Sequence, residues 1–90
     1  MEETIAITVT GKVQGVFYRQ STKEKAQELG ITGIVKNLPD GSVHIMASGT
    51  NDQLNQLVAW CKQGPPRAQV AAVHVEKISR HAFFGFTVQR

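Results

Sequence analysis

The segment GKVQGVFYR, residues Gly11 to Arg19, places two glycines and one arginine between an apolar run and a predicted helix. Glycine allows backbone N–H groups to turn toward a ligand, and the start of a helix favours negative charge. Arg19 adds a planar set of donors that suits phosphate oxygens. The segment therefore predicts an anion site, while a plain turn followed by a solvated arginine is the alternative that these residues alone leave open.

The expected anion is small. The segment has neither the lysine–serine pair of a nucleoside triphosphate site nor the glycine fingerprint of a dinucleotide site. Gly11 and Gly15 are the positions where we expect positive φ and a missing Cβ to let successive amides close around a ligand.

Asn37 is the second residue with chemical potential, because it ends a predicted strand just before the turn sequence LPDG. An asparagine at a strand end commonly makes a turn with its own backbone. If this strand lies near the first strand, the carboxamide can instead donate and accept at once and hold a water molecule beside the anion. Both interpretations remain open from the residues alone.

The first half of the chain predicts a strand, a helix and a hairpin. Apolar and polar residues alternate over Thr4 to Thr10, with the isoleucines and Val9 on one face. Helical spacing runs from about Gln20 to Leu29, and Gly30 follows as a C-cap. The segments 31–38 and 42–49 flank PDG, which predicts an antiparallel hairpin.

The second half repeats the pattern. Thr50 and Gln53 match a capping box for a second helix, and Gly64 with the following prolines ends it. Residues 68–78 predict a fourth strand, in which a change of parity between Val70 and Val73 indicates a bulge. Residues 83–89 predict a short closing strand.

This order predicts an α+β fold, the ferredoxin-like split βαβ sandwich: βαββαβ plus a short closing strand, with an antiparallel sheet and two helices on one face. Each helix should join two strands that are parallel but not adjacent. Ninety residues suit a single domain spanning 1–90. Many unrelated functions use this fold, so the function must be argued from the site.

The composition and net charge of the chain limit the classes of molecule that it is expected to bind. The net charge of +3 favours anions without forming a dense basic patch, and the chain shows no export signal or bilayer-spanning run. The single cysteine, Cys61, allows no internal disulfide and indicates a cytoplasmic protein. The central strands lack the stacking aromatics of an RNA-binding sheet, and the first loop lacks the paired cysteines of a metal chaperone. We expect a monomer with no nucleic-acid or membrane partner.

Three segments, VTGKVQGVFYR, GIVKNLPDGSVHIMASG and GPPRAQV, resemble the acylphosphatase family, and the similarity runs from the first strand to the end of the chain. The resemblance implies hydrolysis of the carboxyl–phosphate bond of acyl phosphates to a carboxylate and inorganic phosphate, without metal or cofactor. It implies that Arg19 binds phosphate and that Asn37 orients the attacking water. The implied phosphate loop consists of Gln14, Gly15, Val16, Phe17, Tyr18 and Arg19.

Two positions depart from the family pattern. Tyr18 stands where Phe or Met is common, and its added hydroxyl requires a partner or water. Ile34 stands where an aromatic residue is common, and we expect it to reduce the wall beside Asn37 and to alter either the packing there or the preferred acyl group.

The implied mechanism has no side-chain base, so we expect a phosphate oxygen of the substrate to accept the proton of the water. The alternative from another class is a non-catalytic regulatory module of the same fold that binds phosphate or acyl phosphate without turnover.

The other reactive or aromatic residues predict structural roles. Cys61 lies on the apolar stripe of the second helix, where a buried thiol is typical. Trp60, beside that stripe, should pack in the core or at its rim. His44, His74 and His81 are not spaced as metal ligands are, so they should fill positions in strands or on the surface. Phe84, Phe86 and Val88 alternate as residues on one face of a strand do, so they are the best core candidates near the C-terminus.

Overall fold

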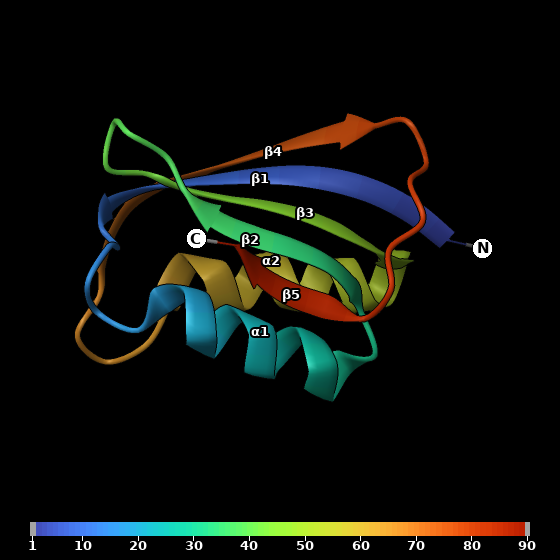
Figure 1. Cartoon of the computed structure of the whole chain (residues 1–90), viewed down its shortest axis with the longest axis horizontal. Helices are drawn as coiled ribbons and strands as arrows, with labels where there is room; N and C mark the ends of the chain where they lie inside the picture. The colour runs from blue at the N-terminus through green and yellow to red at the C-terminus, as the bar shows by residue number, and fades with distance from the viewer. Residues whose placement is uncertain (1, 90) are drawn as a thin grey trace.

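Five strands form one sheet, and two helices cover one of its faces (Figure 1). The computed structural model describes residues 2–89. The elements, in chain order, are β1 (Glu2–Lys12), α1 (Tyr18–Leu29), β2 (Thr32–Asn37), β3 (Val43–Thr50), α2 (Asn51–Gln63), β4 (Gln69–Ile78) and β5 (Phe86–Gln89). The predicted order of helices and strands is confirmed, with α1 beginning earlier than expected.

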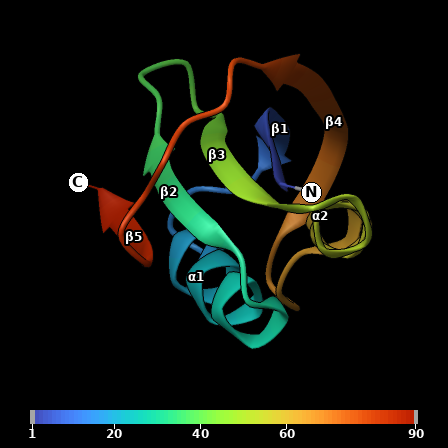
Figure 2. The same cartoon turned by 90° about the vertical axis from the view of Figure 1, so that its right-hand side faces the viewer.

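The strands lie in the order β4-β1-β3-β2-β5. The pairs β1/β3, β1/β4 and β2/β3 are antiparallel, so α1 joins β1 to the parallel, non-adjacent β2, and α2 joins β3 to β4 in the same way. Figure 2 shows both helices under the same face of this sheet. The predicted split βαβ arrangement is therefore confirmed for four strands.

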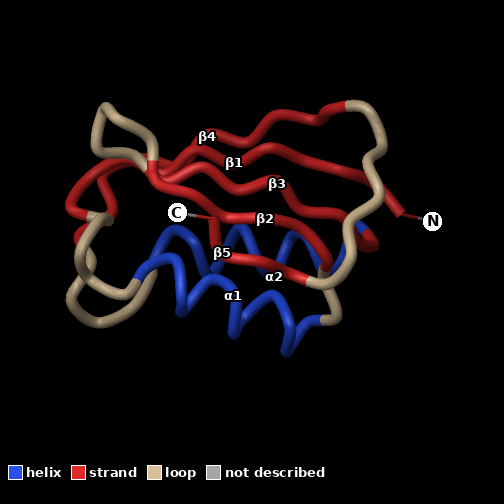
Figure 3. Tube along the Cα trace, viewed as in Figure 1, coloured by secondary structure: helices blue, strands red, loops and turns tan. Residues whose placement is uncertain are grey.

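The expectation of an antiparallel sheet is wrong at one edge. β5 pairs with β2 in parallel, with Gly33 opposite Phe86 and Val35 opposite Val88. The connection from β4 crosses the end of the sheet before β5 begins, and Figure 3 shows this long loop in tan. β4 runs antiparallel to β2, and the loop stays at one end of the sheet and reverses the chain, so β5 runs in the same direction as β2 and adds a fifth strand at the edge.

Most of the core lies between the sheet and the helices. Ile5, Ile7 and Val9 of β1 are buried there, as their alternation predicts. Thr4, on the opposite face, is also buried, which alternation alone does not predict. Its hydroxyl lies 2.7 Å from the hydroxyl of Ser48 and accepts a hydrogen bond from the backbone N–H of His81, in the loop that crosses this end of the sheet.

Both helices end where the sequence predicts. The capping box of α2 is present, with Gln53 N–H donating to Thr50 Oγ1 at 3.2 Å and Thr50 N–H donating to Gln53 Oε1 at 2.8 Å. Gly30 and Gly64 occupy the C-cap positions. Neither helix within residues 2–89 has the length and apolar character needed to cross a bilayer.

The predicted bulge lies at Ala71, between the pairs Thr10/Ala72 and Gly11/Val70. It changes the role of Gly11. This glycine has a φ of +122°, and a Cβ there would collide with the backbone of Gln69 and Ala71. The missing Cβ therefore makes room for β4, and the expectation that Gly11 leaves space for a ligand is wrong.

Phe84 is also wrongly assigned as a core residue, because its side chain is fully exposed. β5 begins only at Phe86, and Gly85 before it has a φ of +67°. Strand parity consequently does not extend back to Phe84. Phe86 is buried and Val88 half-buried, so these two assignments are confirmed.

Candidate active site

A cavity of about 350 Å³ lies at one end of the molecule, where the chain leaves β1, α1 begins, and β2 and β5 end. In Figure 1 these segments meet at the left. The cavity is lined by residues from all four segments: Val13, Gly15, Phe17, Tyr18, Arg19, Gln20, Asn37 and Val88.

The loop before α1 exposes several backbone donors. Gly15 and Phe17 have φ values of +74° and +64°. The first helical hydrogen bond runs from Ser21 N–H to the carbonyl oxygen of Phe17 at 3.0 Å. The N–H groups of residues 18–20 therefore precede the helical ladder, and no side chain caps the helix. No acidic side chain stands in the first turn, so this end of α1 offers donors and a favourable dipole to an anion.

Arg19 extends from the first turn of α1 over the same cavity. Its Nη1 donates to the backbone carbonyl of Gln89 at 2.9 Å, which ties the guanidinium to β5. A guanidinium has five N–H donors, so this bond leaves others for a ligand. Sequence reasoning did not find Gln89, because a backbone carbonyl 70 positions away leaves no mark on the local pattern.

Asn37, at the end of β2, brings a second polar side chain to the lining of the cavity. Its Oδ1 is buried and has no hydrogen-bond partner within residues 2–89. A buried acceptor without a partner is costly unless a water or ligand supplies the donor. Among the described side chains only this atom is left in that state, and it belongs to a residue that lines the cavity.

Gln14 does not line the cavity and instead joins its two loops. Its Nε2 donates to the carbonyl oxygens of Leu38 and Ser42, each at 2.9 Å. The backbone N–H of Leu38 also donates a hydrogen bond to the carbonyl oxygen of Ser42. The carboxylate of Asp40 accepts a hydrogen bond from the hydroxyl of Ser42 at 2.6 Å. This bond and the one from the Ser42 N–H lower the pKa of Asp40. The turn after Asn37 is thus closed and attached to the loop before α1.

Tyr18 is buried beneath the loop, and its hydroxyl has found the partner it requires. The Oη donates to the carbonyl of Cys61 at 2.7 Å, in the last turn of α2, and the ring packs against Trp60 with centroids 5.5 Å apart. Half-buried Trp60 is thus at the core rim, as expected. These contacts fix the start of α1 against the end of α2.

Cys61 is buried as expected, and burial raises the pKa of its thiol to about 12. A thiol with this pKa is a poor nucleophile at neutral pH.

Ile34 is placed differently from the expectation. It lies opposite Met46 of β3 and alternates with buried Val35, so it faces away from the helices. Asn37 shares the face of Val35, two residues further on. The expectation that Ile34 forms the wall beside Asn37 is therefore wrong.

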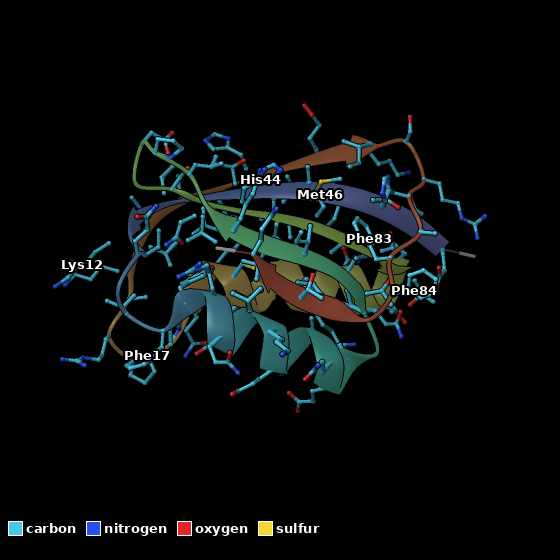
Figure 4. The ribbon with its side chains drawn as sticks, in the orientation of Figure 1. Lys12, Phe17, His44, Met46, Phe83 and Phe84 are labelled. Atoms are coloured by element: carbon cyan, nitrogen blue, oxygen red, sulfur yellow. The ribbon has the colours of Figure 1, made fainter. Side chains whose placement is uncertain are left out.

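The three histidines lie apart from the cavity. His44 is half-buried on β3, near Thr8 and on the open face of the sheet with Met46, as Figure 4 shows. Burial, with a smaller effect of Lys36, lowers its pKa. His74 and His81 are exposed. In the part of the chain that the structure describes, no three His, Cys, Asp or Glu side chains group as metal ligands do.

The structure brings together Gly15, Phe17, Tyr18, Arg19 and Asn37 of the predicted site residues. Gln14 and Val16 do not line the cavity; the side chain of Val16 is buried in the core. Val13, Gln20 and Val88 line it without having been predicted. The sequence predicted the closing strand that carries Val88, but no local pattern in that strand indicates that it reaches this cavity.

Comparison with known proteins places these observations in a family. A family model described as Acylphosphatase matches residues 5–88. An acylphosphatase from Acaryochloris marina is 51% identical over 82 residues, which cover 91% of this chain and 88% of the relative. The solved acylphosphatase structure from Coxiella burnetii has a TM-score of 0.95 and 45% identity, covering 98% of this chain and 93% of that one. The structure from Bacillus subtilis has a TM-score of 0.94 and 32% identity, covering both chains completely.

Proposed function

This chain belongs to the acylphosphatase family and hydrolyses acyl phosphates, and we propose that Arg19, Asn37 and the loop amides perform this reaction in the cavity at the start of α1. The observation that carries the proposal is the unpartnered Oδ1 of Asn37 in the cavity that also holds Arg19. An anion fits the arginine and the amides, while the free acceptor fits a water molecule.

In this proposal the phosphate group binds between the guanidinium of Arg19 and the N–H groups of the loop 14–18 and the first helical turn. These donors stabilise the negative charge on the equatorial phosphate oxygens in the transition state. The contact between Arg19 and Gln89 supports the assignment, because it holds the guanidinium in place before substrate arrives.

Asn37 holds the attacking water by accepting a hydrogen bond from it at Oδ1, and the proton in this hydrogen bond stays on the water oxygen. The water oxygen forms a bond to phosphorus as the bond between phosphorus and the acyl oxygen breaks. The electron pair of the broken bond leaves with the carboxylate, and the other proton of the water passes to a phosphate oxygen of the substrate. The products are a carboxylate and inorganic phosphate. A carboxylate is a good leaving group, so positioning and charge stabilisation suffice.

We further propose that the reaction needs neither metal nor cofactor, and that the chain acts as a single-domain cytoplasmic monomer without nucleic-acid or membrane partners. The direct experiment measures hydrolysis of benzoyl phosphate with and without a chelator and with added inorganic phosphate. Activity that survives the chelator and is competitively inhibited by phosphate supports the proposal. A metal requirement overturns metal independence, and phosphate binding without turnover returns the chain to the regulatory alternative.

A further inference from the structure

Phe17 has a backbone conformation that its residue type disfavours. Among the described residues it is the one non-glycine with positive φ, at φ 64° and ψ 22°. A Cβ in this left-handed region approaches the following carbonyl oxygen, so glycine or asparagine normally occupies it. Phe17 also stands at the N-cap of α1, where serine, threonine, aspartate or asparagine would bond to a free N–H. Neither the backbone conformation nor the N-cap position therefore accounts for a phenylalanine at residue 17.

The packing of the loop does not explain the phenylalanine either. Val16 and Tyr18, on either side, are only 6% and 1% exposed, whereas Phe17 is 69% exposed. The neighbours anchor the loop in the core, and the ring of Phe17 points outward. An exposed ring gains little from burial, so its presence is not accounted for by folding.

The position of the ring relates it to the cavity. Phe17 lines the cavity with Arg19 and Asn37, and Val13 and Val88 complete an apolar part of the wall. In Figure 4 the ring of Phe17 projects from the end of the molecule where α1 begins. If the phosphate group lies on the helix N-terminus and Arg19, the acyl group must extend toward the open side, where this ring stands.

We propose that the ring of Phe17 is a specificity determinant that contacts the acyl group and favours acyl phosphates with aromatic or bulky apolar acyl groups over small ones, an inference that rests on the proposed function of this cavity. An apolar ring next to a bound acyl group removes apolar surface from water on both partners, and two aromatic rings gain further from edge or offset contacts. A two-carbon acyl group is too small to gain much from the same contact.

The test compares kcat/KM for benzoyl phosphate with kcat/KM for acetyl phosphate in the parent and in Phe17 variants. In Phe17→Ala we expect the ratio of the two values to fall roughly tenfold. Phe17→Gly should lower the ratio equally, although glycine relieves the backbone. Phe17→Trp keeps an aromatic surface and should preserve the ratio within about threefold. This pattern separates the side chain from the backbone conformation.

Phe84→Ala is the matched control, because Phe84 is a fully exposed phenylalanine at the opposite end of the molecule (Figure 4). The ratio of kcat/KM for benzoyl phosphate to kcat/KM for acetyl phosphate in Phe84→Ala should equal that of the parent. The inhibition constant of inorganic phosphate shows whether each variant keeps an intact phosphate site. An unchanged ratio in Phe17→Ala, with both substrates hydrolysed by the parent, overturns the inference and leaves the proposed function standing. A parent that hydrolyses neither substrate overturns both.

Discussion

The side-chain amide of Gln14 donates to the carbonyl of Leu38, the residue directly after Asn37, at 2.9 Å. The same nitrogen donates to the carbonyl of Ser42 across the turn, also at 2.9 Å. One side chain of the loop before α1 thereby sets the position of the strand end that carries Asn37. In the proposed mechanism, the distance between the bound phosphate and the water on Asn37 depends on this connection.

Replacing Gln14 with glutamate should make activity depend on the charge of residue 14. A carboxylate cannot donate to the two carbonyls, so at pH 7 we expect kcat roughly tenfold lower, equivalent to about 1.4 kcal/mol. A protonated carboxyl has one O–H donor and can restore one bond. The ratio of variant to parent kcat should therefore rise as the pH falls from 7 toward about 4.

Gln56→Glu provides the control for Gln14→Glu, since it makes the same change on an exposed face of α2. Its kcat should follow that of the parent at each pH. A Gln14→Glu variant with a pH profile parallel to that of the parent would show that Gln14 does not position Asn37.

Arg19 should be replaceable by lysine only in part. Loss of its charge-assisted contacts in Arg19→Ala should weaken binding of inorganic phosphate by about 1.5 to 3 kcal/mol. Lysine keeps the positive charge but lacks the planar pair of donors that can reach both the ligand and the Gln89 carbonyl. Arg19→Lys should therefore recover only part of the lost phosphate-binding free energy. Titration calorimetry with phosphate measures the difference, with Lys62→Ala on α2 as a control for net charge. Equal phosphate affinity in Arg19→Lys and the parent would contradict the requirement for a guanidinium.

Cys61 should make the protein less stable in alkali. Burial raises the pKa of its thiol from 9.0 to about 12, so above pH 9 the unfolded chain releases a proton that the folded chain retains. The unfolded state then binds fewer protons, and the free energy of unfolding falls as the pH rises from about 9 toward 12. The fully developed slope for one proton is about 1.4 kcal/mol per pH unit.

Urea unfolding of Cys61→Ala and the parent between pH 7 and 10.5 tests this slope. The variant should lose stability less steeply above pH 9. Burial, the largest cause, also raises the pKa of Tyr18 in both proteins, whereas the smaller effect of Cys61 on Tyr18 is lost in the variant and makes its curve flatter in the same direction. Parallel curves would mean that the thiol is as accessible in the folded chain as in the unfolded one.

Local patterns predicted most of the fold, because each element carries its own signals. The capping box at Thr50 and Gln53 and the glycine at position 30 mark helix ends through short-range bonds. The parity change in residues 70–73 marks a bulge within one strand. The direction of β5 could not be predicted in this way, because it depends on the path of the loop before it and on pairing with β2.

The functional site likewise has one part that the sequence predicted and one part that it could not predict. Arg19 and Asn37 could be proposed from residue type, position and family resemblance, and they line one cavity. The left-handed backbone of Phe17 could not, since phenylalanine disfavours that conformation and its residue type therefore does not indicate it. The Gln89 carbonyl that holds Arg19 and the Leu38 carbonyl that holds Gln14 are backbone atoms, which any residue would supply.

The most direct test of the proposed site is the kcat of Asn37→Ala, measured with benzoyl phosphate beside the inhibition constant of inorganic phosphate. If Asn37 holds the attacking water, kcat should fall on the order of 100-fold, while the phosphate constant should stay close to that of the parent because Arg19 and the loop amides are unchanged. Near-normal turnover in Asn37→Ala would contradict the account.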